Sequence, residues 1–487
     1  MAKTVLRGAV VYDGTGEAAR DADVAIDDGR IHTVGEVGSG ATEIDVTGLA
    51  IAPGFVDVHT HDDFAALLHP DMGFKLLGGV TTCVVGNCGM GCAPFEQASV
   101  LSTAFHPGAE LPPWMGHDGY LAHLEAHPPG VNVAALAGHG TIRLAAMGVR
   151  RGEPGGEQMR RMKAHLQEGL DAGVFGLSTG LIYEPGRYAR TEELIELASV
   201  MRGTGALYAS HMRDEGTGLL DSVNETIRIG EEAGVGVQVS HHKAFGHAAW
   251  GLVNDSLKLI EEAQDRGVDV HADQYPYTAG STVLAAVLDR AVGEGAPLRL
   301  ADIVIASAAS HPRWEGKSIP EMGTDWGLDA ASAGRRVLEE EPGVTVVLHS
   351  MDEQDVRTVL RHRSTMIGSD GIPTLGAKPH PRLYGTFARV LGHYARDLGL
   401  LPLSEAIHRM TGLPAGKFGF RGRGIVREGA VADLVVFDPA RIEDTATFEE
   451  PNRHPAGIAH VFVNGVHAVA HGALTGERAG RALRRGD

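Results

Sequence analysis

Cysteine is scarce in this sequence: only Cys83, Cys88 and Cys92 occur among 487 residues, within ten positions of one another. So short a cluster cannot form a disulfide framework, which excludes a small secreted scaffold. Long hydrophobic runs are also missing, because no apolar run approaches the roughly 18 residues that span a bilayer. The first eleven residues are typical of a strand and lack the apolar region and cleavage site of a signal peptide. We therefore expect a cytoplasmic protein with no membrane partner.

Positive charge is in short supply too. The chain has 43 lysines and arginines against 62 aspartates and glutamates, a formal net charge of −19. A basic surface for nucleic acid is therefore not expected. The arginines near the C-terminus have acidic neighbours and are interpreted as a solvated tail; they are Arg478, Arg481, Arg484 and Arg485. Histidine is abundant, with 25 residues, which leaves room for a metal site without proving one.

Turn signals between short β-branched runs mark both ends of the chain. Asp13-Gly14 and Asp28-Gly29 separate such runs near the N-terminus, and Asn464-Gly465 does the same near the C-terminus. These dipeptides favour tight β-hairpins. We expect residues 1–53 and 421–487 to form one small antiparallel β-sandwich domain from the two termini.

The middle of the chain, residues 54–420, alternates short apolar runs with amphipathic helical stretches. Valine-rich runs that alternate with helices indicate parallel strands buried on both faces. Eight such units predict an α/β fold, a (β/α)8 TIM-type barrel. The predicted strands lie near Gly54–Val58, Val80–Val85, Val131–Ala137, Val174–Leu177, Leu207–Ala209, Val235–Val239, Val268–His271 and Met366–Ile367. Residues 283–343 are predicted to be an inserted, helix-rich subdomain that covers the pocket, with a candidate extra strand at Val344–Leu348.

Several predicted strands end in residues that bind metals. His59 and His61 are two positions apart, so both imidazoles face the same side of a strand, at the mouth of the barrel. Cys88 follows the second strand, where a thiolate can join nitrogen ligands around zinc. His211 and His241 each follow a serine at the end of consecutive strands, a repetition that packing does not explain. Any one of these residues, viewed alone, has a structural role as its alternative.

Neighbouring positions supply further candidates. Side chains alternate between the two faces of a strand, so Lys243 is expected to point into the mouth, like His241. There it would be a cation for an anionic substrate group. His242 is expected to point away and is interpreted as a structural residue. Asp370 ends the eighth strand, where a carboxylate can take a proton from a metal-bound water and pass it to a leaving group. A turn role within Asp-Gly is the alternative. Cys83, within a strand, and Cys92, in a loop, are interpreted as structural.

The assembled motifs resemble those of a known family. The segment Ala52–His61, together with a β-domain built from both termini, resembles the amidohydrolase superfamily. Further motifs narrow the resemblance to the D-aminoacylases, that is, the N-acyl-D-amino-acid deacylases, over nearly the whole chain. These motifs are Gly86-Asn87-Cys88-Gly89, Gly138–Arg143, Ser178–Leu181, Ser240–Lys243, Asp273–Tyr277 and His380–Arg382.

The resemblance implies a zinc-dependent hydrolase that cleaves N-acyl-D-amino acids, small-molecule substrates, into a carboxylic acid and a free D-amino acid. His211, His241 and Cys88 match the ligands of a tightly bound zinc. His59 and His61, with Cys88 as a bridge, match a second and weaker metal site. The implied cofactor is therefore Zn²⁺, with one tight site and one weaker site.

Catalytic and substrate-binding roles also follow from the resemblance. Metal-activated water would attack the acyl carbonyl, with Asp370 as general base and then acid, and Tyr183 matches a residue that stabilises the oxyanion. The positions that hold the substrate α-carboxylate are matched by Lys243, Tyr275, Ser281 and Arg382. Clamping that carboxylate with lysine and arginine fixes the Cα substituents in a handed arrangement that prefers the D form. Leu348 and Met351 are expected to line the side-chain pocket and to favour an apolar side chain over an acidic one.

Two alternatives stay open at this point. The first is another amidohydrolase activity, either cyclic-amide hydrolysis or deamination of a ring. Cyclic-amide hydrolysis normally uses a lysine on the fourth strand, and Phe175–Thr179 contains none, an absence that a bridging Cys88 explains. The second is a non-catalytic scaffold, although each expected ligand position is filled. The sequence does not fix the preferred acyl group, the number and identity of the metals, or the oligomeric state.

Overall fold

Eight short parallel strands form the centre of the computed structural model, which describes residues 4–102, 105–106, 108–293, 296 and 298–486. They lie where the sequence predicts them. In chain order they are β6 (Phe55–Asp57), β7 (Val80–Val85), β8 (Asn132–Ala135) continued by β9 (Ala137–Gly138), β10 (Gly176–Gly180), β11 (Leu207–His211), β12 (Gly236–Val239), β13 (Val270–Gln274) and β17 (Thr365–Ile367). Every residue of β7 is buried, as expected for a parallel strand with both faces covered.

The eight strands close into a barrel. One sheet has the order β17-β13-β12-β11-β10-β9, and a second contains β8-β7-β6. The two sheets meet between β8 and β9, where Leu136 N donates to Val85 O at 2.9 Å. The circle closes on the other side through a parallel bridge between Thr60 and Gly371, which follow β6 and β17. The predicted (β/α)8 barrel is therefore confirmed, with the carboxyl ends of its strands gathered at one mouth.

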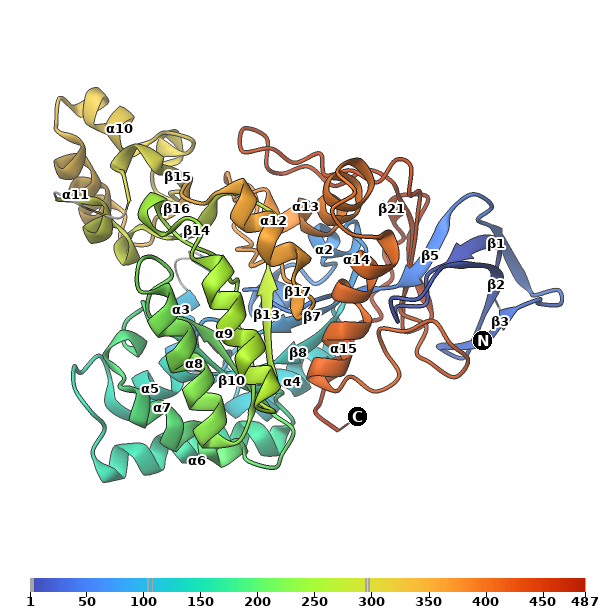
Figure 1. Cartoon of the computed structure of the whole chain (residues 1–487), viewed down its shortest axis with the longest axis horizontal. Helices are drawn as coiled ribbons and strands as arrows, with labels where there is room; N and C mark the ends of the chain where they lie inside the picture. Colours follow the sequence, from blue (N-terminus) through green and yellow to red (C-terminus); the bar gives the residue numbers. More distant parts are fainter. Residues whose placement is uncertain (1–3, 103–104, 107, 294–295, 297, 487) are drawn as a thin grey trace.

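Helices surround the strands (Figure 1). On α8 (Leu219–Ala233) the apolar residues Val223 and Ile227 recur at helical spacing and are buried. A Cβ on Gly230 would come within 2.0 Å of Val237 Cγ2, so glycine allows α8 to pack closely on β12. The remaining barrel helices include α1 (Ala65–Leu68), α2 (Gly73–Leu76), α3 (Phe95–Ser102), α4 (Gly116–Ala126), α5 (His139–Met147), α6 (Gly156–Ala172), α7 (Thr191–Ala198), α9 (Val253–Asp265), α12 (Glu353–Arg361), α13 (Arg382–Arg389), α14 (Leu403–Met410) and α15 (Gly412–Phe418).

A separate nine-stranded sheet is built from both ends of the chain and lies beside the barrel (Figure 1). Its strands are β1 (Thr4–Val11), β2 (Arg20–Asp27), β3 (Arg30–Gly35), β4 (Thr42–Asp45), β5 (Ala50–Pro53), β18 (Leu434–Phe437), β19 (Ile458–Val463), β20 (Val466–Ala470) and β21 (Ala473–Leu474). Antiparallel pairing of β5 with β18 joins the two ends, whereas β1 pairs in parallel with β4 and β5. Val24, Ile51 and Phe462 belong to a core of its own. We propose residues 1–53 and 421–487 as the bounds of this domain and 54–420 as those of the barrel.

The C-terminal tail returns to the barrel. Strand β22 (Ala482–Leu483) pairs in parallel with β8. Arg484 Nη1 donates to Asp118 Oδ1 at 2.8 Å, and Arg485 Nε donates to Val174 O at 3.2 Å. The expectation of a solvated tail is therefore wrong for these arginines, because carboxylates and carbonyl oxygens of the barrel bind them.

The insertion before the last barrel strand contains a small sheet as well as helices. Strands β14 (Gly280–Val283), β15 (Ile303–Ser307) and β16 (Thr345–Leu348) pair antiparallel in the order β14-β16-β15. Helices α10 (Ile319–Trp326) and α11 (Ala330–Glu340) complete it, and Figure 1 shows it projecting from the barrel. The extra strand expected at Val344–Leu348 is β16, whereas β14 and β15 were not expected. We propose 283–343 as the bounds of the inserted subdomain, which β14 and β16 flank; residues 294, 295 and 297 lie outside the described residues.

No helix among the described residues combines the length and the apolar character needed to cross a membrane.

A buried polar cluster fastens the small sheet to the barrel. The carboxylate of Asp433 accepts from Asn132 Nδ2 of β8 at 3.1 Å and from Asn464 N at 2.6 Å. It also forms an ion pair with Arg423, and both side chains of that pair are at most a tenth exposed. Asn464 Nδ2 in turn donates to Asn132 Oδ1 at 2.8 Å. Asn132 and Arg423 have further acceptors in Thr81 O and Asn464 Oδ1, but Asp433 is the acidic partner of Arg423 within this cluster.

We expect Asp433→Ala to lower the free energy of unfolding by about 3 to 5 kcal/mol, since it leaves the buried Arg423 without its counter-charge. Urea and thermal unfolding of the variant would measure the loss. Asp21→Ala removes an exposed aspartate of β2 and should change stability by less than about 0.5 kcal/mol. Equal stability of the two variants would contradict a fastening role for Asp433.

Candidate metal centre and active site

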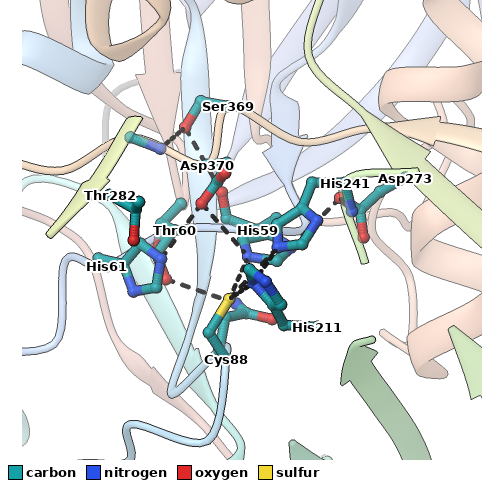
Figure 2. A network of polar contacts seen from close by, with 12 residues as sticks. His59, Thr60, His61, Cys88, His211, His241, Asp273, Thr282, Ser369 and Asp370 are labelled. Atoms are coloured by element: carbon teal, nitrogen blue, oxygen red, sulfur yellow. Dashed lines mark hydrogen bonds and ion pairs between the residues drawn. The ribbon is translucent and has the colours of Figure 1, made fainter. Parts of the chain in front are cut away.

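Metal-binding side chains from separate strands converge at the mouth of the barrel (Figure 2). His59 and His61 follow β6, Cys88 follows β7, His211 ends β11, and His241 follows β12. All are buried, and Asp370, which follows β17, is buried beside them. Two sets have ligand atoms within 4.8 Å of one another: His59, His61, Cys88 and Asp370 form one, and Cys88, His211 and His241 form the other. Cys88 belongs to both sets.

The spacing of the donor atoms fits a metal ion. Cys88 Sγ lies 3.4 Å from His59 Nε2, 3.6 Å from His211 Nδ1 and 3.5 Å from His241 Nε2. A tetrahedral ion with Zn–S and Zn–N bonds of ordinary length places sulfur and nitrogen ligands about 3.6 Å apart. His211 Nδ1 and His241 Nε2 are also only 2.8 Å apart. Sulfur and imidazole nitrogen together form a donor set that suits zinc.

Three of these residues have an unusual backbone. Cys88, His241 and Asp370 have φ angles of 53°, 37° and 49°, in the left-handed region that residues other than glycine rarely adopt. Hydrogen bonds hold two of them there: Asp370 N donates to His59 O at 2.7 Å, and His241 N donates to Asp273 Oδ1 at 2.8 Å. Such conformations cost about 1 to 3 kcal/mol each and cluster at functional sites. Here the sharp turns follow directly after strands whose ends meet at the mouth.

Two carboxylates that the sequence reasoning did not identify orient the histidines. Asp273 Oδ1 lies 3.2 Å from His59 Nδ1. Glu215 Oε1 lies 2.9 Å from His241 Nδ1 and accepts from Lys243 Nζ at 2.6 Å. A carboxylate on the outer ring nitrogen fixes the orientation of a metal-binding imidazole. Asp273 is part of the Asp273–Tyr277 motif on which the family resemblance rests. For Glu215 the only hint in the sequence is that it lies four residues after His211, a predicted metal ligand.

A buried lysine ties the first and last barrel strands together below the site. Lys75 Nζ lies 2.8 Å from Asp57 Oδ2 and 3.2 Å from Asp62 Oδ2, and it donates to Ser369 Oγ at 3.1 Å. Asp57 Oδ1 also accepts from Ser369 N at 2.8 Å. These contacts fix the segment that carries His59 and His61 relative to the turn that carries Asp370. No sequence motif pointed to Lys75.

The electrostatics of the site favour ionised Cys88 and Asp370. Burial alone raises the pKa of Cys88, but the charges of His59 and His241 bring that pKa well below its ordinary value. Burial likewise raises the pKa of Asp370. The charges of the Arg382 guanidinium and of His241 outweigh this effect and hold the pKa of Asp370 well below its usual range. A thiolate can ligate a metal, and a carboxylate can accept a proton.

A pocket beside the metal centre contains most of the predicted substrate-binding residues. Its wall includes Tyr183, Lys243, Tyr275, Ser281, Leu348 and Asp370, together with His61, His211 and His241. Phe245, Val287 and Arg290 also line it, and none of these three was identified from the sequence. Tyr183 OH lies 2.9 Å from Thr282 Oγ1 of β14. The inserted segment thus forms part of the pocket wall.

Two predicted substrate-binding residues lie behind this wall. Arg382 is 1% exposed, with its guanidinium 4.4 Å from the centre of the Tyr275 ring and Nη1 2.9 Å from Asp370 Oδ2. Met351 packs in a small cluster with Tyr275 and Tyr277. Both therefore contact the pocket through Tyr275, and Arg382 also contacts it through Asp370.

The residues interpreted as structural lie away from the metal centre. His242 Nε2 is 2.9 Å from Ser256 Oγ of α9, so its imidazole faces the helix layer. Cys83 is fully buried in the main core, with its thiol next to Asp62. Cys92 belongs to the same core, and its carbonyl accepts from Trp114 Nε1 at 2.9 Å.

Comparison with known proteins finds similarity to metal-dependent hydrolases over nearly the whole chain. Residues 42–469 match the amidohydrolase family. The chain is 42% identical to D-aminoacylase of Alcaligenes xylosoxydans xylosoxydans, over 99% of this chain and 97% of that protein. It is 38% identical, with a TM-score of 0.89 and 99% of both chains covered, to N-acyl-D-glutamate deacylase from Bordetella bronchiseptica, crystallised with zinc and a phosphonate mimic of the tetrahedral intermediate. A D-aminoacylase structure that addresses a binuclear metal centre is 41% identical, with a TM-score of 0.90 and 99% of both chains covered.

We expect Cys88→Ala to lower the divalent metal content of the purified chain at least about tenfold, because this thiolate belongs to both ligand sets. Elemental analysis after dialysis against metal-free buffer measures the content. Cys83→Ala is the matched control, since Cys83 is equally buried but lies in β7 outside both sets. Metal retention by Cys88→Ala at the level of the Cys83→Ala control would refute the assignment.

Proposed function

The chain belongs to the amidohydrolase family, and we propose that it is a zinc-dependent hydrolase of N-acyl-D-amino acids that releases a carboxylic acid and a free D-amino acid. One observation carries the proposal: a sulfur and nitrogen donor cluster lies next to an ionised carboxylate and a pocket that contains lysine. The related deacylases support the substrate class. We also propose a cytoplasmic location and no nucleic-acid or membrane partner; the net charge of −19 argues against a nucleic-acid partner.

The metal would be held by the two overlapping sets. We assign the tight zinc to Cys88, His211 and His241, and a weaker second metal to His59 and His61 with Cys88 as the bridge. When bound, zinc polarises the acyl carbonyl and makes a water molecule acidic enough to act as the nucleophile near neutral pH.

Asp370 and Tyr183 carry the proton transfers and the charge stabilisation that the chain itself provides. Asp370 is buried and ionised, so it accepts the proton of the attacking water and then delivers it to the departing amine nitrogen. Burial raises the pKa of Tyr183 well above its ordinary value, so its hydroxyl stays protonated. That hydroxyl donates a hydrogen bond to the oxyanion that develops as the carbonyl is attacked.

The α-carboxylate of the substrate would bind where positive charge and hydroxyl groups meet. Lys243, Tyr275 and Ser281 line the pocket, and Arg382 lies directly behind Tyr275. Arg382 Nη2 donates to Ser281 O at 3.1 Å, which positions its guanidinium between Ser281 and Asp370. With the carboxylate fixed at this point and the carbonyl fixed at the metal, the pocket that takes the side chain is the third constraint that selects one hand of Cα, and the family resemblance assigns the D form.

The alternatives are less well supported. Strand β10 (Gly176–Gly180) contains no lysine that could bridge two metals, as cyclic-amide hydrolases of this superfamily normally require. A scaffold without catalysis would have no need for the buried donor cluster and its two orienting carboxylates, because burying such groups is costly.

Asp370→Asn should reduce kcat for N-acetyl-D-leucine by about 100- to 10,000-fold, because the amide cannot accept the proton. The tight zinc set does not include Asp370, so about one zinc per chain should remain bound. Release of D-leucine and elemental analysis measure the two quantities, with N-acetyl-L-leucine as the substrate control. Asp355→Asn, at a buried carboxylate that accepts from Gly251 N, is the matched variant and should remain active. Unchanged turnover by Asp370→Asn would refute its role.

The side-chain pocket has an apolar wall and one arginine. Leu348, Val287 and Phe245 line it with Arg290. Arg290 Nη2 already donates to Asp214 Oδ1 at 2.8 Å, so Asp214 offsets the positive charge that Arg290 presents to the pocket. The expectation of an apolar substrate side chain is therefore kept as a proposal.

We expect kcat/KM for N-acetyl-D-leucine and N-acetyl-D-methionine to exceed that for N-acetyl-D-glutamate and N-acetyl-D-aspartate by at least about tenfold, since burying an uncompensated carboxylate is costly. Steady-state kinetics on the four substrates measure the preference. Asp214→Asn removes the carboxylate that pairs with Arg290, so it should narrow the difference in kcat/KM between the apolar and the acidic substrates. If the unchanged protein preferred N-acetyl-D-glutamate, the proposal of an apolar side chain would be wrong. Arg290 would then bind the substrate carboxylate instead of binding Asp214.

A further inference from the structure

Two cavities meet at the metal centre. The first is the pocket described above, which contains Lys243, Tyr275, Ser281 and Asp370. The second has a volume of about 390 Å³ and lies on the side of Cys88. Met90, Phe105, Ile182 and Tyr183 line both cavities, so they form the partition between them.

The second cavity has an apolar wall. Leu101, Phe105, Ile182, Val283, Ala285 and Ala286 contribute side chains to it. Glycines also line it, among them Gly180 at the end of β10. A Cβ on Gly180 would come within 2.1 Å of Cys88 O and 2.7 Å of Tyr183 Cδ2, so glycine there allows β10 to lie close to the loop that carries Cys88. Charged groups of the lining, Glu184 and Arg187, are exposed to solvent and lie at its rim.

The chemistry of an amide assigns an occupant to each cavity. A scissile carbonyl carbon carries the nitrogen of the amino acid on one side and the acyl chain on the other. The groups assigned to the α-carboxylate belong to the first cavity, so the amino-acid part lies there. With the carbonyl held at the metal and at Tyr183, which borders both cavities, the acyl chain extends into the second cavity.

We propose that this second cavity is an acyl-chain subsite that selects substrates with an apolar acyl group of about six carbons in preference to acetyl, an inference that rests on the proposed function. A single methyl group would leave most of its 390 Å³ to water, because one water needs only about 10 to 15 Å³ of such volume. A longer alkyl chain displaces that water and buries apolar surface against the wall. Pocket contacts to added methylenes change kcat/KM by about tenfold or more.

The test compares N-acetyl-D-leucine with N-hexanoyl-D-leucine on the zinc-loaded full chain. We expect kcat/KM to be at least about tenfold higher for the hexanoyl substrate. Ala285→Phe fills the cavity from an exposed position in the 3-10 turn that follows β14, and it should lower the ratio of hexanoyl to acetyl kcat/KM at least about fivefold. Ala473→Phe, at an equally exposed alanine of β21 outside both cavities, should leave the ratio unchanged.

The outcomes separate the subsite from the activity. Hydrolysis of N-acetyl-D-leucine with equal or slower hydrolysis of the hexanoyl substrate would overturn the subsite and leave the proposed function standing. A preference for hexanoyl that Ala285→Phe does not alter would place the acyl chain elsewhere and also overturn it. Hydrolysis of neither substrate would overturn both proposals. Retained melting temperature and zinc content in Ala285→Phe show that a changed ratio reflects the pocket.

Discussion

The placement of one buried thiolate constrains the rest of the site. Cys88 Sγ lies within 3.6 Å of ring nitrogens from three histidines that come from β6, β11 and β12. Its backbone must turn into the left-handed region directly after β7 to aim the sulfur at them. Strand β10 contains no lysine, and its last residue, Gly180, lies against the backbone oxygen of Cys88.

Charge pairing is the second constraint. Each cation near the reaction centre has a carboxylate partner: Lys243 pairs with Glu215, Arg382 with Asp370, and Lys75 with Asp57. Removing one partner from such a buried pair costs more than the pair itself contributes. Arg382 therefore holds Asp370 from behind the pocket wall, with the Tyr275 ring against its guanidinium. Under the proposed function, a substrate carboxylate bound beside Tyr275 brings a second negative charge close to the same guanidinium.

How much the sequence predicts depends on the range of the interaction. The eight strands and the ligands at their ends could be predicted because apolar runs and a period of two act locally. Asp273, Glu215 and Lys75 could not, because their contacts join strands and helices far apart in the chain. β15 was missed since its five residues stand in a segment with helical patterning on both sides. The arginine tail was misjudged because its partners, such as Asp118 and the carbonyl of Val174, are more than 300 residues away.

The barrel and the inserted segment contribute different parts of the site. All the proposed metal ligands and Asp370 come from barrel strand ends, where small shifts would disturb the chemistry. In contrast, β14 and the 3-10 turn after it run along both cavities: Ser281 and Thr282 line the first, and Val283 and Ala285 line the second. We expect a substitution in this segment to change the shape of one cavity without moving a proposed metal ligand. Because β14 is held by β16 of the insertion rather than by the barrel sheet, the insertion can alter specificity while the metal centre stays fixed.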